Sequence, residues 1–241
     1  MAARLDFCNL LSYMIQSSKG RRNMEKLNPT HYPASRATVV VMNHINYKLG
    51  GPNRLYDRLD VTTANKEVIP GLGNKYYLKF SIEDALNKKE AIKCTAEVLY
   101  YTNKQIAPNV TYSLQPEPQN YTAAKDNEFY SRIRGRSEPL IAEDIPDSFG
   151  NIAPDMEPIW HLALASCAFV KLQNATEETL YSAVVIKKVT EVKRDDAALE
   201  FHYDVLIHQM VTQEMEPWSI ESVWDPIEGL RIKKSTPHDK D

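Results

Sequence analysis

In the segment from Leu199 to Met210, the apolar residues Leu199, Phe201, Tyr203, Val205 and Ile207 recur at every second position, mostly between polar neighbours. A period of two is typical of a half-buried β-strand. Further along the chain, Trp218, Ile220 and Trp224 recur at even spacings and predict a second strand. The stretch VTQEMEPW that joins them, residues 211–218, is therefore predicted to be the tip of a β-hairpin.

One order of elements is predicted twice along the chain. In the first half, a helical pattern from Pro33 to the glycine pair at 50–51 precedes four strand-like segments, at about 54–69 and from Lys75, Ala91 and Asn109. In the second half, a helix from Pro154 precedes strands near 178–193, 198–210, 217–224 and 229–234. By analogy of fold, one helix followed by a four-stranded antiparallel meander resembles the cystatin arrangement. The prediction is an α+β fold of two tandem cystatin-like domains, each with one helix wrapped by a four-stranded antiparallel sheet.

The duplication and the polar linker between its halves predict the domain organisation. The predicted parts are an N-terminal extension (1–23), domain 1 (24–117), a connecting segment (118–151), domain 2 (152–235) and a C-terminal tail (236–241). The connecting segment contains NEFYSRIRGRS, in which Phe129, Tyr130 and Ile133 fall on one side of a short amphipathic helix.

Charge and cysteine usage exclude several classes of protein. The net charge is −3 and the basic residues are dispersed, so no nucleic-acid partner is expected. Cys8, Cys94 and Cys167 lie far apart without a Cys-x-x-Cys pair, which favours buried free thiols over disulfides or a zinc site. No apolar run is long enough to span a bilayer, and no membrane partner is expected. A cytoplasmic protein is predicted, although residues 1–23 could also form an amphipathic targeting or membrane-surface helix.

The histidines do not predict a catalytic or metal site. His202 and His208 share a strand face with Asp204, but six residues of strand separate the two imidazoles by roughly 20 Å, so they cannot hold one ion. A third element could complete a site around either histidine, yet a solvated polar face is the favoured interpretation. His161 lies within an apolar helix face and is predicted to be a hydrogen-bonded core histidine. No nucleophile, phosphate-loop or zinc motif occurs, so no catalytic residue, cofactor or metal is expected.

Several ordered strings closely resemble the latexin family, which includes ovocalyxin-32 and the tazarotene-induced protein. They are HYPASRA from His31, KYYLKFSIED from Lys75, KCTAEVLY from Lys93, NEFYSRI from Asn127, EPLIAEDIPDSFGNIAPDM from Glu138, QNATEET from Gln173 and EPW from Glu216. The resemblance runs from about Met24 to Lys234, and residues 1–23 precede the point where family members begin.

The resemblance implies two cystatin-like domains packed helix to helix and an inhibitor of A- and B-type zinc metallocarboxypeptidases. The target enzyme would bind where the domains meet, and the free protein is expected to be a monomer. The family's enzyme contacts near this hairpin match His208 and Gln213, and the implied contact set is His208, Thr212, Gln213, Glu214 and Met215.

Two other functions stay open for this fold. A non-inhibitory binding or matrix protein, as in ovocalyxin-32, would leave the hairpin tip as ordinary solvated surface. A cysteine-protease inhibitor is suggested by Pro217-Trp218, but such inhibitors need a Gln-x-Val-x-Gly wedge, and this string is absent from the sequence.

Overall fold

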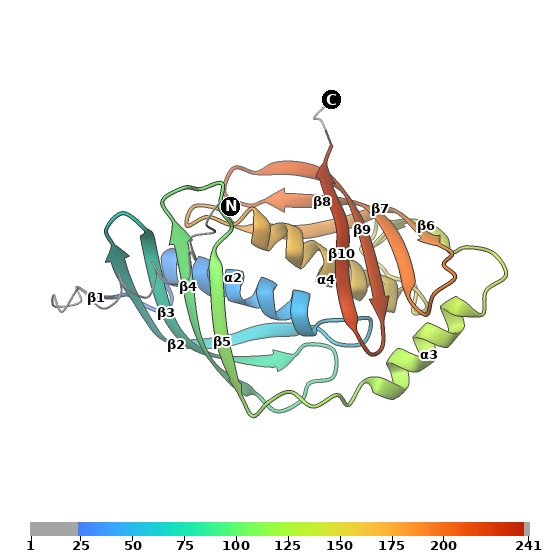
Figure 1. Ribbon diagram of the computed structural model, residues 1–241, viewed down its shortest axis with the longest axis horizontal. Coiled ribbons are helices and arrows are strands. Elements are labelled where there is room, and N and C mark those ends of the chain that lie inside the picture. Colours follow the sequence, from blue (N-terminus) through green and yellow to red (C-terminus); the bar gives the residue numbers. More distant parts are fainter. Residues whose placement is uncertain (1–23, 239–241) are drawn as a thin grey trace, which may run out of the picture.

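The computed structural model describes residues 24–238, which form two five-stranded antiparallel sheets, each crossed by a long helix (Figure 1). The first half of the chain forms one sheet in the order β1-β2-β3-β4-β5. Its elements are β1 (Met24–Lys26), α2 (Tyr32–Leu49), β2 (Tyr56–Ile69), β3 (Gly73–Asp84), β4 (Ile92–Tyr101) and β5 (Asn109–Gln115). The second sheet has the order β10-β9-β8-β7-β6. It is built with α3 (Ala123–Arg134), β6 (Ile141–Ile145), α4 (Glu157–Gln173), β7 (Tyr181–Val192), β8 (Leu199–Gln209), β9 (Glu214–Asp225) and β10 (Gly229–Pro237).

The predicted pair of helix-and-meander units is confirmed, with two corrections at the edges. Each sheet has five strands rather than four, because β1 pairs with β2 and β6 pairs with β7. The connecting segment thus contributes a strand to the second sheet. The predicted tail is also shorter, since β10 continues to Pro237. The predicted N-terminal extension and Cys8 lie outside the described residues.

Helices α2 and α4 lie side by side between the two sheets (Figure 1). Helix α4 carries buried residues around its whole circumference, as expected of a helix covered on all sides. One side faces its own sheet and the other faces α2. The helices run antiparallel. Arg36, near the start of α2, contacts Glu177 beyond the end of α4, and Tyr47, near the end of α2, packs on the earlier residue Phe169 of α4 at 5.0 Å between ring centroids. The partner in the second half thus moves backwards along the chain as α2 advances.

Each domain contributes side chains to the hydrophobic core of the other across this helix pair. Leu172 and Ala175, at the end of α4 and just after it, lie in the hydrophobic core of the first domain. Leu55, which follows α2, lies in the core of the second domain. Since each core is completed by residues of the other half, the domains form one packed body.

The loop after α2 adds polar links to the second half. The ring nitrogen Nδ1 of His161 lies 3.0 Å from the carbonyl oxygen of Pro52, which confirms the predicted hydrogen-bonded histidine. Burial lowers the pKa of His161 and outweighs the opposing effects of the Pro52 carbonyl and of the Glu157 and Asp84 carboxylates. The amide of Asn53 donates to Asp126 at 2.9 Å, which ties the same loop to α3.

Two further predictions concern the thiols and the membrane. Cys94 and Cys167 are buried free thiols, as predicted, and burial raises the pKa of Cys94 to about 12 and that of Cys167 to about 11. Within residues 24–238, no helix combines the length and apolar character needed to cross a bilayer.

Leu172→Ala tests the exchange of core residues. Leu172 is 7% exposed, so its truncation should lower the free energy of unfolding by about 2 to 4 kcal/mol through lost burial and a residual cavity. Because Leu172 belongs to the second domain's helix but the first domain's core, amide exchange should accelerate in both sheets. Ile227→Ala is the control, since Ile227 is 91% exposed and should change stability by less than about 0.5 kcal/mol. Faster exchange in the second sheet alone would contradict the shared core.

Candidate functional site

The hairpin predicted from the sequence joins β8 to β9, and its tip is the four-residue loop Met210–Gln213. The loop is closed by the pair Gln209 and Glu214, and His208 lies opposite Met215 one step further back. The predicted tip VTQEMEPW, residues 211–218, therefore needs a correction. Glu214 and the residues after it already belong to β9, so the turn starts one residue earlier and ends five residues earlier than the sequence pattern placed it.

The tip is braced by its own side chains. The buried carboxamide of Gln209 accepts the amide N–H of Val211 at 2.8 Å, and the side-chain amide of Gln213 donates to the carbonyl of Met210 at 2.5 Å. The hydroxyl of Thr212 donates to Glu214 at 3.3 Å. Gln213 adopts the left-handed conformation, with φ of 62°, which costs a non-glycine residue about 1 kcal/mol. Backbone strain of this kind is concentrated at functional sites.

Apolar side chains surround the polar tip. Met210, Val211 and Met215 are 43%, 46% and 42% exposed, so each presents an uncovered hydrophobic surface beside Gln213. The predicted contact set is thus held on one hairpin end, with His208 partly exposed behind it. Met210 and Val211 were absent from that set, which the family resemblance implied, and their exposure becomes visible only in the structure.

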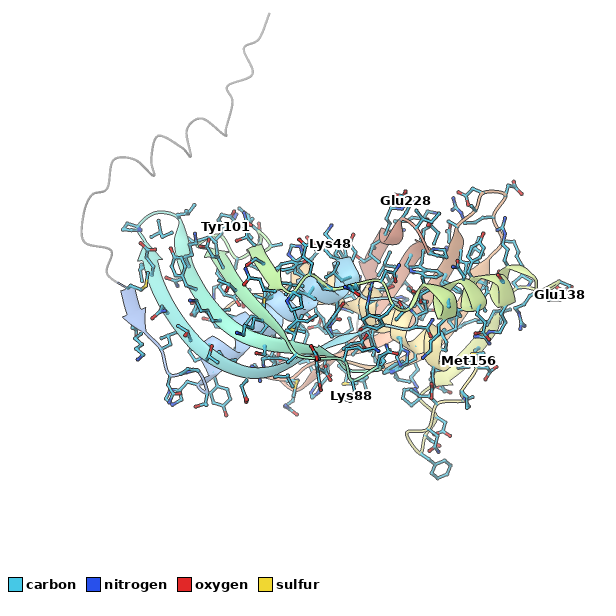
Figure 2. The ribbon with its side chains drawn as sticks, turned by 90° about the horizontal axis from the view of Figure 1, so that it is seen from below. Lys48, Lys88, Tyr101, Glu138, Met156 and Glu228 are labelled. Carbon is cyan, nitrogen blue, oxygen red and sulfur yellow. The ribbon has the colours of Figure 1, made fainter. Side chains whose placement is uncertain are left out.

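A second protruding element is the loop of residues 147–151, which follows β6. The carboxylate of Asp147 accepts the backbone N–H groups of Phe149 at 2.9 Å and Asn151 at 2.8 Å, and these bonds lower the pKa of Asp147. Gly150 has φ of 83°, a conformation that favours glycine. The loop presents Phe149 with 88% of its surface exposed. In Figure 2 the segment before Met156 projects from the body of the protein.

One edge of the second sheet connects the two protruding elements. β6 covers β7 only as far as Ile186, and beyond it a surface groove of about 620 Å³ lies between the 147–151 loop and residues 184–187 of β7. Tyr181, three residues before Val184 and so about 10 Å along the strand, pairs with Gln209 at the base of the tip. The tip, the β7 edge and the Phe149 loop are therefore consecutive along one border of the sheet.

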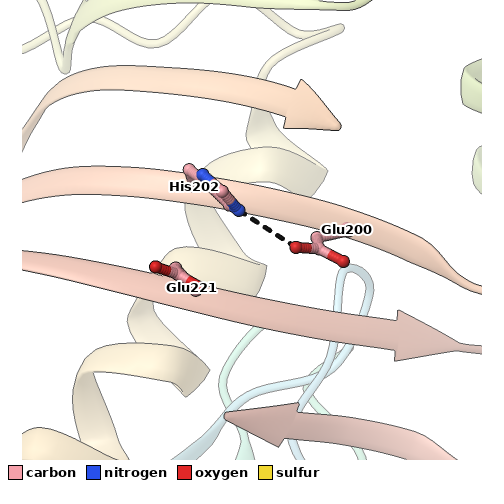
Figure 3. Close-up of side chains that lie close together, drawn as sticks. All are labelled: Glu200, His202 and Glu221. Carbon is pink, nitrogen blue, oxygen red and sulfur yellow. Dashed lines mark hydrogen bonds and ion pairs between the residues drawn. The ribbon is translucent and has the colours of Figure 1, made fainter. Parts of the chain in front are cut away.

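The outer face of the same sheet brings together three possible metal ligands that the sequence did not group. Glu200, His202 and Glu221 have potential ligand atoms within 4.8 Å of one another (Figure 3). His202 and Glu221 are cross-strand partners, and Nε2 of His202 lies 3.0 Å from Glu200. Register between β8 and β9 creates this cluster, and register cannot be read from one strand.

Cations already occupy the central carboxylate of this cluster. The side chain of Glu200 is 4% exposed, and it accepts Lys233 at 2.6 Å and also the guanidinium of Arg194. Burial alone would raise the pKa of Glu200, but Lys233, His202 and Arg194 together lower it to about 2. A divalent ion would have to displace two bound cations from a carboxylate that is fully paired, which argues for an ion-pair network.

A serine, a histidine and an aspartate also meet on this face, but not as a catalytic relay. Nε2 of His238 lies 2.6 Å from the hydroxyl of Ser219, whose hydroxyl donates to Asp204. In a Ser-His-Asp triad the carboxylate binds the ring nitrogen remote from the serine. Here Asp204 contacts the serine itself and lies 3.8 Å from the same nitrogen of His238. The hydroxyl is thus held by the acid rather than activated by the base.

The paired helix-and-sheet units and the braced hairpin place this chain in the class of tandem cystatin-like proteins. Comparison with known families is more specific. The family model described as Latexin matches residues 27–241. The chain belongs to the latexin family.

The curated relatives support this membership over most of the chain. Latexin of Homo sapiens is 41% identical over 212 residues, which covers 88% of this chain and 96% of that protein. Latexin of Mus musculus is 42% identical with the same coverage, and ovocalyxin-32 of Gallus gallus is 31% identical across 88% of this chain and 77% of its own length. Among solved structures, mouse fetuin-B is 13% identical and covers 89% of this chain and 70% of its own, with a TM-score of 0.29.

Zinc titration tests the ion-pair interpretation of the Glu200 cluster. Because Lys233 and Arg194 neutralise Glu200, stoichiometric zinc should leave the melting temperature unchanged within about 1 °C. A specific site would instead stabilise the fold by about 2.7 kcal/mol at a hundredfold excess over Kd. A rise of several degrees that disappears in His202→Ala would show that the cluster is a metal centre.

Glu200→Gln tests the same network by its pH dependence. At pH 7 the substitution should lower the free energy of unfolding by about 2 kcal/mol, the scale of a lost hydrogen bond to a charged group. The folded-state pKa of Glu200, about 2, is below its ordinary value of 4.5, so its contribution is complete above pH 4.5 and is lost as the pH falls towards 2. The difference between variant and wild type should therefore shrink over this range in urea titrations. A difference independent of pH would mean that packing, not charge, holds Glu200.

Proposed function

We propose that this protein inhibits A- and B-type zinc metallocarboxypeptidases by docking the β8–β9 tip over the entrance of the enzyme's active-site funnel. The observation that carries the proposal is the exposed tip itself, in which Gln213 is held in a left-handed conformation by the chain's own hydrogen bonds. Membership of the latexin family supports this assignment, and the family resemblance implies that His208 and Gln213 occupy enzyme-contact positions.

The tip has the physical properties of an inhibitory contact. A turn that is already ordered loses little conformational entropy on binding, so more of the contact energy contributes to affinity. The apolar rim of Met210, Val211 and Met215 can exclude water, while Gln213 offers an amide to groups that normally hold the substrate's terminal carboxylate. The edge of β7 and the Phe149 loop can widen the contact towards a standard interface of about 800 Å² per partner.

The remaining expectations follow from charge and thiol chemistry. The protein is proposed to be cytoplasmic, since its buried Cys94 and Cys167 suit a reducing compartment. The family resemblance is the reason for proposing that it is monomeric when free. The dispersed charges give no basis for nucleic-acid binding. The inhibitor is proposed to work without a cofactor, as a protein ligand rather than an enzyme.

The decisive experiment is a stoichiometric titration of purified A-type and B-type carboxypeptidases with this protein. Progressive loss of activity to an endpoint near one equivalent is expected. No inhibition of either enzyme would favour the non-inhibitory binding protein suggested by the ovocalyxin-32 match. Inhibition of a papain-type protease instead would favour the cysteine-protease alternative.

Gln213→Ala tests the tip against an A-type enzyme. Loss of one hydrogen bond at a desolvated position costs roughly 0.5 to 1.5 kcal/mol, and up to about 3 if a buried partner is left unpaired, so inhibition should weaken by roughly threefold to a hundredfold. His208→Ala should have a smaller effect from its position behind the tip. The double variant Gln213→Ala with Glu214→Ala should weaken inhibition furthest.

Gln213→Gly separates the side chain from the backbone. Both variants remove the amide, but glycine adopts a φ of 62° without strain. Equal loss of inhibition by Ala and Gly would assign the effect to the amide, whereas loss in Ala alone would assign it to the turn conformation. In urea unfolding, Gln213→Ala should stay within about 0.5 kcal/mol of wild type, whereas Gln213→Gly should gain up to about 1 kcal/mol from relief of the left-handed strain. Unchanged inhibition by every variant would move the contact away from the tip.

A further inference from the structure

The side chain of Glu177, in the loop between α4 and β7, is bound entirely by residues of the first domain. Its carboxylate accepts hydrogen bonds from Lys66 at 2.9 Å, Asn74 at 2.6 Å and Tyr76 at 2.5 Å. Burial alone would raise the pKa of Glu177, but the bonds from Tyr76, Asn74 and Lys66 outweigh it and keep the pKa below its usual value. The Glu177 carboxylate therefore anchors the second domain to the first domain.

The backbone around Glu177 is fixed as well. The guanidinium of Arg36 donates to the carbonyl of Glu177 at 3.2 Å, and Ala175 is buried in the first domain's core. Glu177 itself lies within a tight turn of residues 176–179, in which the hydroxyl of Thr179 accepts the N–H of Thr176 at 2.8 Å. This turn leaves little freedom between the anchor and the start of β7.

The turn leads directly to the hairpin tip. The carbonyl of Leu180, three residues after Glu177, accepts the N–H of Met210 at 2.7 Å. Tyr181 pairs with Gln209, whose side chain in turn accepts the N–H of Val211. A path made of the Glu177 hydrogen bonds, the short backbone segment from Glu177 to Tyr181 and the hydrogen bonds of Leu180 and Gln209 thus runs from the first domain's sheet to the first two residues of the tip.

We propose that Glu177 is a positioning residue, through which the first domain sets the orientation of the β8–β9 tip that the second domain presents. This role gives the first domain a part in recognition that does not depend on its own contact with the target. Its effect on inhibition rests on the function proposed above, whereas its effect on the tip's structure does not.

The adjacent glutamate supplies a matched control. Glu178 has the same charge and pairs with Lys104 at 2.7 Å, but both side chains are mostly exposed, at 73% and 65%. An exposed pair of this kind contributes little to stability. Glu178→Ala therefore removes one glutamate carboxylate from the same loop and leaves the hydrogen bonds of Glu177 to the first domain intact.

The experiment compares Glu177→Ala, Glu177→Gln and Glu178→Ala by amide hydrogen exchange in the free protein and by inhibition of an A-type carboxypeptidase. In Glu177→Ala, exchange of the Met210 amide should accelerate by about tenfold, and inhibition should weaken by a similar factor. Glu177→Gln keeps an acceptor for Tyr76, and the amide of Asn74 can rotate to pair with it, so this variant should stay within about threefold of wild type. Glu178→Ala should match wild type in both measurements.

The Tyr203 amide, in the middle of β8, reports on whether the whole second sheet is loosened. Selective acceleration at Met210, with Tyr203 unchanged, supports positioning, whereas equal acceleration at both would show a merely structural residue and overturn the proposal. Unchanged exchange at Met210 in Glu177→Ala would also overturn it. Asn74→Ala provides the same test from the first domain if Glu177→Ala does not fold. If the wild-type protein fails to inhibit, the exchange measurements still decide the role of Glu177, and only the inhibitory function is lost.

Discussion

The close packing of α2 against α4 is the constraint on which the rest of the fold depends. A single helix lying on one curved sheet leaves its far side uncovered, and here each helix covers the other. The contact is tight near Gly50, where an added Cβ would lie 3.3 Å from that of Ala165 and only 2.3 Å from the carbonyl oxygen of Asn46. This close approach brings the loop after each helix onto the start of the other helix. Pro52 thereby meets His161, and Glu177 meets Arg36.

The sequence predicted the elements well because amphipathic periodicity is a local property. The alternation from Leu199 to Ile207 correctly gave the buried face of β8, and the proline and glycine positions marked both long helices. Two of the four edge strands, β1 and β6, were missed for a physical reason. β1 has three exposed residues, and most of β6 is exposed, so neither shows the alternation of a strand with one buried face. Their strand conformation comes from pairing with β2 and β7, which is a tertiary effect.

The candidate site was predicted only in part because its important contacts join distant segments. The hairpin was found from two alternating runs, but its exact turn depends on the left-handed Gln213, which no periodicity signals. Glu177 lies within a string that carried the family resemblance, yet its partners Asn74 and Tyr76 are about a hundred residues away. The sequence pattern of either domain alone does not indicate that the carboxylate of Glu177, in the second domain, is bound by residues of the first.

The duplicated unit contains a second copy of the hairpin, and the two copies have opposite surroundings. In the first domain the equivalent connection, residues 85–91 between β3 and β4, folds onto Asp84, whose carboxylate accepts the backbone N–H groups of Leu86 and Asn87 and the hydroxyl of Tyr121. That copy is tied to the connecting segment and so serves the internal structure. The copy at Met210–Gln213 is held from its base and from within, with its apolar side chains exposed. Duplication thus allows one hairpin to stabilise the junction while the other presents a surface, and the asymmetry between them supports the proposal that recognition belongs to the second domain.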